Sequence, residues 1–169
     1  MTPGINQAKR AKVPYTVHEY IHDPTCDSYG SEAAIKMGVP EERVFKTLVV
    51  KLGTKELAVG VVPVSSMINM KLIAKATETK RASMADASDV ERSTGYVLGG
   101  VSPLGQKKQL KTIIDLSATK YPTIFVSAGR RGLEIELKPQ DLKELTNGEF
   151  AELCTSNKFS NKAFQGCSR

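Results

Sequence analysis

The stretch Val44-Phe45-Lys46-Thr47-Leu48-Val49-Val50 decides how this chain folds. It is rich in β-branched and aromatic residues, which is typical of a buried strand. A turn around Gly53 leads into a second apolar run at residues 57–63, so two neighbouring strands are predicted. Lys46 interrupts the first run. Because burying an unpaired ammonium group is costly, Lys46 is predicted either to lie on an open strand face or to contact a phosphate or carbonyl of a ligand.

The elements on either side of this pair alternate irregularly. Helices are predicted at residues 3–12, 31–37, 86–95 and 139–145, each with a capping residue or proline at its start, and at residues 70–77 from apolar spacing. Strands are predicted at residues 15–21, 112–116, 123–127, 133–137 and 150–154. No steady βαβ rhythm is present, which favours an α+β domain with a mixed sheet over a Rossmann fold. One domain is expected over residues 1–154, and the polar segment 155–169 is expected to be a disordered tail.

Composition and charge limit the classes of partner. The chain has 169 residues and a net charge of +6, but residues 156–169 hold three of the cations and no acid, which leaves 21 basic and 18 acidic residues elsewhere. This mild excess permits contact with a tRNA end but is low for a duplex-binding protein. No signal-like or membrane-length apolar run is present, and the three cysteines lack CxxC spacing. We therefore expect a cytoplasmic protein in a reducing compartment, with no disulfide framework and no membrane contact.

Two glycine-containing stretches are candidates for ligand binding. In Gly99–Lys108, three glycines, a proline and a serine fall within seven residues, and two lysines follow. Bare backbone amides edged by cations suit a carbonyl, a ribose or a phosphate. The stretch Ser127–Gly132 combines a hydroxyl, glycine amides and two guanidinium groups. Ordinary turns with solvated cations are the alternative for both stretches. Neither has the glycine spacing of a nucleotide-binding motif.

The spacing of His18, His22 and Cys26 would align three metal ligands only on a helix. Residues 15–21 are predicted to be a strand, however, and Pro24 would break a helix. No metal site is therefore predicted. Cys26 beside His22 remains an alternative nucleophile, although no third group to orient the pair is apparent.

Several separated motifs together resemble the YbaK/prolyl-tRNA synthetase editing-domain family. They are Phe45-Lys46-Thr47-Leu48, Met84-Ala85-Asp86, Ser93-Thr94-Gly95-Tyr96, the stretch Gly99–Lys108, Val126-Ser127 and Arg131-Gly132-Leu133. The resemblance runs in order from Thr2 to about Cys154. It implies a mixed, largely antiparallel sheet that forms a small barrel with surrounding helices.

The resemblance also implies a function in translation fidelity. Members of the family remove cysteine from mischarged Cys-tRNA(Pro), and from Cys-tRNA(Cys), without a metal, a cofactor or a protein nucleophile. The thiol of the substrate attacks the ester and releases a cysteine thiolactone, so the enzyme class is lyase-type or hydrolase. An aminoacyl-tRNA is the implied partner, and a cysteinyl- or prolyl-tRNA synthetase is a candidate second partner. Alternatives are a deacylase for Ala-tRNA(Pro), a hydrolase that uses Cys26, and a non-catalytic tRNA-binding or synthetase-associated module.

The residues at the family's functional positions form two implied sets. The implied catalytic set places one lysine near the tRNA 3′ end and two glycines that present backbone amides: Lys46, Gly99 and Gly100. The implied substrate-binding set lines the pocket and supports the substrate: Tyr20, Tyr29, Ser102, Ser127, Gly129 and Arg131. The sequence departs from the family pattern at Tyr29, Ala128 and Arg130, where phenylalanine, glycine and lysine are usual. Ala128 narrows the backbone conformations that are open to the Ser127 loop.

Overall fold

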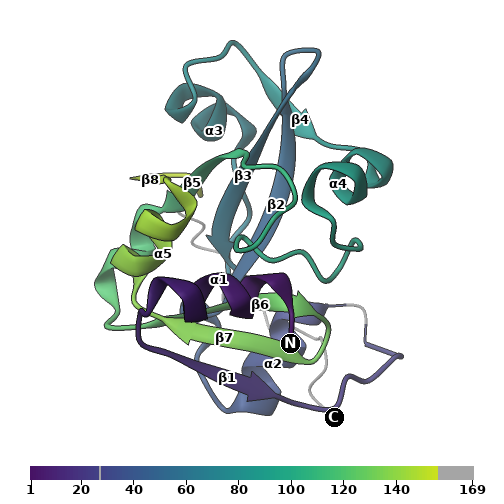
Figure 1. Ribbon diagram of the computed structural model, residues 1–169. Coiled ribbons are helices and arrows are strands. Elements are labelled where there is room, and N and C mark those ends of the chain that lie inside the picture. Colours follow the sequence, from purple (N-terminus) through teal and green to yellow (C-terminus); the bar gives the residue numbers. More distant parts are fainter. Residues whose placement is uncertain (27, 156–169) are drawn as a thin grey trace.

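Two β-sheets form the framework of the protein (Figure 1). The computed structural model describes residues 1–26 and 28–155, so the predicted tail lies outside the described residues from position 156 onward. One sheet has five strands in the order β4-β2-β3-β5-β8, and the other has three in the order β1-β7-β6. The strands are β1 (Tyr15–Glu19), β2 (Phe45–Leu52), β3 (Glu56–Pro63), β4 (Ala82–Met84), β5 (Lys111–Asp115), β6 (Ile124–Arg130), β7 (Leu133–Leu137) and β8 (Glu149–Ala151).

The strand pairing confirms the predicted mixed and largely antiparallel α+β fold. Strands β2 and β3 form the predicted pair, in register from Phe45 opposite Pro63 to Leu52 opposite Glu56. Of the strand pairs in the described residues, β3–β5 and β5–β8 are parallel and the other four are antiparallel. Within the described ranges, one isolated parallel bridge, between Val44 and Phe125, links the two sheets. Among the described residues the strands do not close into one hydrogen-bonded ring, so the small barrel stays a prediction.

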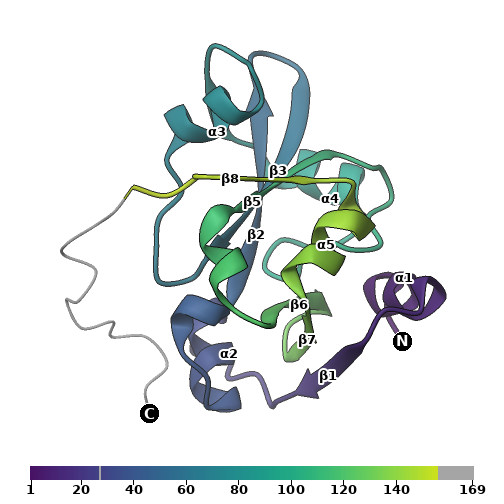
Figure 2. The same ribbon diagram turned by 90° about the vertical axis from the view of Figure 1, so that its left-hand side faces the viewer.

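The part of the chain that the structure describes has five α-helices, which pack around the sheets. They are α1 (Pro3–Ala11), α2 (Tyr29–Met37), α3 (Met70–Ala76), α4 (Ala87–Thr94) and α5 (Pro139–Thr146), with 3₁₀ turns η1 (Glu41–Arg43) and η2 (Leu116–Lys120). Thr2 caps α1 by accepting a hydrogen bond from the Ile5 amide at 3.3 Å. Helix α1 packs against β6 and α5 (Figure 1, Figure 2). No described helix has the length and apolar character needed to cross a bilayer.

Some element boundaries differ from those predicted. Helix α2 begins at Tyr29 rather than at Ser31, because Ser28 is the extended residue that precedes the helix. Strand β6 continues past Ser127 through a bulge to Arg130, so the predicted turn contains only two residues. Strand β4 was not predicted, because three residues on a sheet edge carry no recognisable pattern. These shifts put Tyr29 in the first turn of α2 and Arg131 at the tip of the β6–β7 hairpin.

The alternation of side chains along β2 divides the core in two. Phe45 and Val49 belong to the largest hydrophobic cluster, which takes residues from both sheets and from α1. Val50 and Leu52 point to the opposite face and pack in a second cluster with α3. Near its first residues β2 has no β4 neighbour, since β4 pairs only with Val50–Leu52. The edge of β2 beside Lys46 is therefore open to form a pocket.

Candidate functional site

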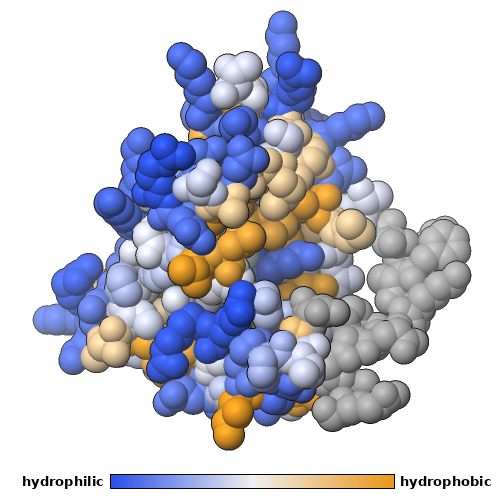
Figure 3. Space-filling view, turned by 90° about the vertical axis from the view of Figure 1, so that its right-hand side faces the viewer, coloured by the Kyte–Doolittle hydropathy of each residue, from blue (hydrophilic) through white to orange (hydrophobic). Residues whose placement is uncertain are grey.

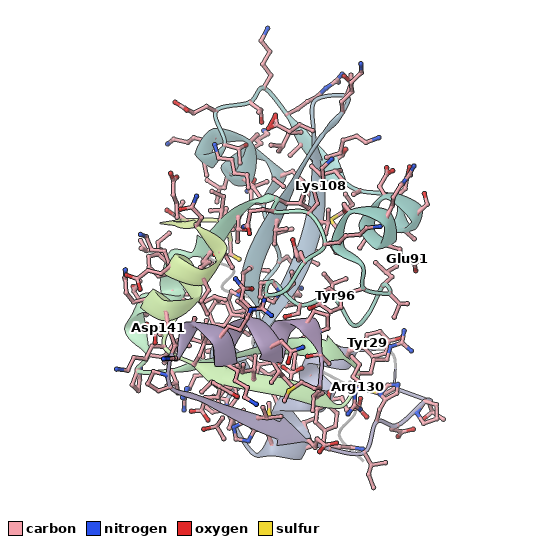
Figure 4. All side chains as sticks on the ribbon, viewed as in Figure 1. Tyr29, Glu91, Tyr96, Lys108, Arg130 and Asp141 are labelled. Atoms are coloured by element: carbon pink, nitrogen blue, oxygen red, sulfur yellow. The ribbon has the colours of Figure 1, made fainter. Side chains whose placement is uncertain are left out.

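A pocket of about 320 Å³ lies at this open edge. Its walls come from the first residues of β2, the start of α2, the loop after α4 and the β6–β7 hairpin. In Figure 4, Tyr29 and Arg130, which both line the pocket, lie close together beside the loop that follows α4. Six of the nine residues that the sequence assigned to the site line this pocket: Tyr20, Tyr29, Lys46, Gly99, Ser127 and Arg131.

The other three predicted site residues are not among those that line the pocket, and each has a role within the protein. The N–H of Gly100 donates to the carbonyl oxygen of Val97 at 2.9 Å, so in this conformation it is not presented to a ligand as predicted. Ser102 is fully buried, and its Oγ accepts from the Leu104 amide. Gly129 donates its N–H to Ser127 Oγ at 3.1 Å. These groups shape the two loops rather than the pocket wall.

Lys46 enters the pocket wall from β2. Burial lowers the pKa of its ammonium group, an effect that the neighbouring Cys154 thiol partly opposes. No hydrogen bond or ion pair joins the Lys46 side chain to another of the described residues. A partly buried cation without a partner favours the binding of a negatively charged or strongly polar group. Lys46 therefore fits the role of contacting a phosphate or carbonyl oxygen better than that of a solvated strand residue.

Gly99 lies beneath a stacked pair of side chains. The Arg131 guanidinium carbon is 4.1 Å from the centre of the Tyr29 ring, and Arg131 Nη2 donates to the Leu98 carbonyl at 3.4 Å. A Cβ at Gly99 would lie 2.7 Å from Arg131 Nη2 and 2.8 Å from Tyr29 Cε2, and the backbone there has a φ of +92°. Glycine is thus required both by the backbone conformation and by the stacked pair.

The two histidines are each paired with a glutamate. His22 Nδ1 is 2.6 Å from Oε1 of the fully buried Glu32, and its ring contacts the Tyr29 ring edge-on at 5.5 Å. His18 Nε2 is 2.9 Å from Glu136 Oε1. Cys26 is buried and is not among the residues that line the pocket, so the structure does not bring its side chain to the site as a nucleophile.

Two pocket residues carry properties that the sequence did not reveal. Glu134 is only 7% exposed, lies opposite Ser127 in the β6–β7 register, and has its pKa raised to about 8 by burial. It is therefore mostly protonated at neutral pH. The Oγ1 of Thr47 is buried without a hydrogen-bond partner among the described residues. In the sequence, Glu134 is indistinguishable from Glu136, and Thr47 reads as an ordinary strand residue.

Comparisons with known proteins show the family to which the chain belongs. Residues 23–145 match the family model described as an aminoacyl-tRNA editing domain. A protein of Enterococcus faecalis named "Putative Cys-tRNA(Pro)/Cys-tRNA(Cys) deacylase EbsC" is 39% identical over 155 residues, which cover 91% of this chain and 93% of that protein.

Solved structures share the fold at lower identity. The structure of a "putative trans-editing enzyme for prolyl tRNA synthetase" matches with a TM-score of 0.77 at 21% identity, over 92% of this chain and 99% of the other. The structure of the "hypothetical protein APE2540" matches with a TM-score of 0.80 at 22% identity, over 90% and 99% of the two chains. The family model and the Enterococcus relative, each covering most of the chain, decide the assignment: this protein belongs to the aminoacyl-tRNA editing domain family.

Proposed function

We propose that this editing enzyme is a free-standing deacylase that removes cysteine from Cys-tRNA(Pro) and Cys-tRNA(Cys). The observation that carries the proposal is the 39% identity to the Enterococcus protein of that name, which extends over nearly the full length of both chains. The pocket supports it, because a volume of about 320 Å³ is at the small end of ligand sites and suits a small aminoacyl group. In this proposal the editing domain spans residues 1–154.

The proposal gives each pocket residue a task. Lys46 contacts the tRNA 3′ end, and Tyr20 and Tyr29 form the walls around the aminoacyl group. Ser127 supports the substrate, and Arg131 holds the wall formed by Tyr29. Gly99 provides the space in which Tyr29 and Arg131 stack. Gly100, Ser102 and Gly129 act indirectly, by fixing the loops that carry these groups.

The proposed reaction needs no nucleophile from the protein. The cysteine thiol attacks the ester carbonyl carbon, a C–S bond forms, and the C–O bond to the terminal ribose breaks. The thiol proton ends on the ribose oxygen, so the products are a cysteine thiolactone and tRNA with a free 3′ end. Holding the thiol and the ester in near-attack geometry supplies roughly 7–11 kcal/mol of the barrier reduction. Because no water is consumed in this step, the chemistry is lyase-type, and hydrolysis of the thiolactone follows.

A panel of charged tRNAs tests the proposal. We expect Cys-tRNA(Pro) to be deacylated far faster than Ser-tRNA(Pro), since a thiol is a few per cent ionised near neutral pH and strongly nucleophilic, whereas a hydroxyl is not. Equal cleavage of the two esters would indicate an activated water and refute the cyclisation. Preferential cleavage of Ala-tRNA(Pro) would show that the protein is an Ala-tRNA(Pro) deacylase instead. Absence of any deacylation under single-turnover conditions would show that the protein is a non-catalytic tRNA-binding module.

Delivery of the tRNA is a separate part of the proposal. Because the described chain is only mildly basic, we propose that a cysteinyl- or prolyl-tRNA synthetase presents the charged tRNA, in the cytoplasm. If only a few cations of the pocket rim contact phosphates, the logarithm of the affinity for tRNA should fall with the logarithm of the salt concentration with a slope of about −2 to −4. A slope near −8 would indicate an extensive basic surface, and the synthetase would then be unnecessary.

A further inference from the structure

The loop after α4 exposes two apolar side chains that are consecutive in the sequence, and the second of them lines the pocket. Val97 is 62% exposed and Leu98 is 54% exposed. Leu98 also lines the pocket, and its carbonyl oxygen accepts the hydrogen bond from Arg131. Figure 3 shows the side of the molecule that carries α4, where apolar side chains gather near the centre of the face. Adjacent exposed apolar residues at a pocket mouth are a mark of a binding surface.

The exposed side chain of Arg131 joins this loop through its hydrogen bond to the Leu98 carbonyl. Its stacking on Tyr29 and its bond to the Leu98 carbonyl hold the planar group in one orientation. We call Val97, Leu98 and Arg131 the mouth platform. Guanidinium planes and apolar side chains are both surfaces against which an unpaired nucleobase stacks. Because Arg131 is already ordered by its two contacts, little conformational entropy would be lost when a base binds.

The chemistry of the substrate places a base near this platform. In an aminoacyl-tRNA the ester is carried by the terminal ribose, and the terminal base is attached to the same sugar. When the ester lies in the pocket, only the ribose ring separates it from the terminal base, so the base lies near the pocket mouth. A pocket of about 320 Å³ that contains the aminoacyl group and the ribose has little space left for a purine. The base must then lie outside, against the rim.

We propose that the mouth platform stacks against the terminal base of the aminoacyl-tRNA and so positions the ester in the pocket. This inference rests on the editing activity, but not on the identity of the amino acid. A protein partner is a poorer fit, because a stable protein interface buries roughly 800 Å² on each side and this platform consists of three side chains. The charge supports a nucleotide as well: Arg130, Arg131 and Lys46 all line the same pocket, where they can balance the adjoining phosphates.

A binding experiment with two RNA probes tests the platform. Both probes are acceptor-stem minihelices that carry cysteine through a non-cleavable amide on the terminal sugar; one has adenine on that sugar and the other has no base there. Leu98→Asn removes the apolar surface at similar side-chain size. Leu116→Asn is the matched control, because Leu116 is 51% exposed on η2 and is not among the residues that line the pocket.

We expect Leu98→Asn to weaken binding of the adenine probe roughly tenfold, the order of one stacked base, and to leave binding of the base-less probe nearly unchanged. Leu116→Asn should change neither affinity, and thermal denaturation should show that both variants are folded. Equal effects of Leu98→Asn on the two probes, or no effect on either, would overturn the proposal. Because the probes are not cleaved, the outcome does not depend on turnover. Failure of the proposed cysteine specificity would instead appear in the panel of charged tRNAs.

Discussion

Replacing Gly99 with alanine should damage both stability and activity. The residue has a φ of +92°, and a Cβ there would approach Arg131 Nη2 to 2.7 Å and Tyr29 Cε2 to 2.8 Å. The left-handed backbone costs an alanine roughly 1–2 kcal/mol, and displacement of the cation–π contact costs about 0.5–1 kcal/mol more. Urea denaturation should therefore show a free energy of unfolding lower by roughly 1.5–3 kcal/mol. Deacylation should fall at least tenfold, because Arg131 and Tyr29 must move to admit the methyl group.

Gly53→Ala separates the two contributions. Gly53 has a φ of +63° at the tip of the β2–β3 hairpin, and a Cβ there would meet no heavy atom within 4 Å. This control has the backbone strain but not the steric contact, and it lies outside the pocket. We expect it to lose stability while keeping full deacylase activity. If Gly99→Ala is as active as Gly53→Ala, the Arg131–Tyr29 stack does not shape the site, and the role assigned to Gly99 is wrong.

Three further variants test the pocket. Lys46→Ala should lower deacylation at least tenfold without unfolding the domain, because the variant removes an unpaired cation. Normal activity in a folded variant would show that Lys46 is only a surface lysine. Thr47→Val should raise the free energy of unfolding by about 1 kcal/mol or more in denaturant titrations, because it removes an unsatisfied buried hydroxyl and keeps the side-chain shape. A loss of stability would show that the hydroxyl has a hydrogen-bond partner. Burial raises the pKa of Glu134 from 4.5 to about 8, so the unfolded state is ionised over a pH range in which the folded state is still protonated. The wild-type protein should therefore lose stability as the pH rises from about 4.5 to 8. In Glu134→Gln the melting temperature should depend less on pH over this range. Identical pH profiles of the wild type and the variant would contradict a raised pKa of Glu134.

The parts of the fold that the sequence predicted are those in which local chemistry determines the structure. The β2–β3 pair follows from two apolar runs joined by a turn at Gly53, and α2 and α4 end at Gly38 and Gly95, which adopt the left-handed conformation. Local patterns could not divide the strands between two sheets. The pairing of Tyr15 with Leu137 joins opposite ends of the domain and depends on which apolar faces fit together, which no short window of sequence encodes.

The candidate site was predictable to the extent that its motifs lie in loops. Gly99 and Arg131 were singled out as ligand-facing, and both line the pocket. The sequence could not show whether a loop glycine leaves space for a substrate or for the protein itself. At Gly99 the space is filled by Arg131 and Tyr29, and at Gly129 a Cβ would meet the ring of Tyr96 at 2.7 Å. Only the tertiary arrangement distinguishes these two uses of glycine.

The protonation of the pocket bears on where the nucleophile comes from. Burial, with the nearby Glu134 and Glu32, raises the pKa of Tyr20, and burial keeps Glu134 itself protonated at neutral pH. No histidine is among the described residues that line the pocket, and Ser127 Oγ already accepts the Gly129 amide. A protonated Glu134 in this site can donate a proton to a developing oxyanion or to the leaving ribose oxygen. The cations Lys46 and Arg131 favour ionisation of a thiol placed between them. In the proposed reaction the substrate brings its own thiol as the nucleophile, and we expect a serine ester in the same position to react far more slowly.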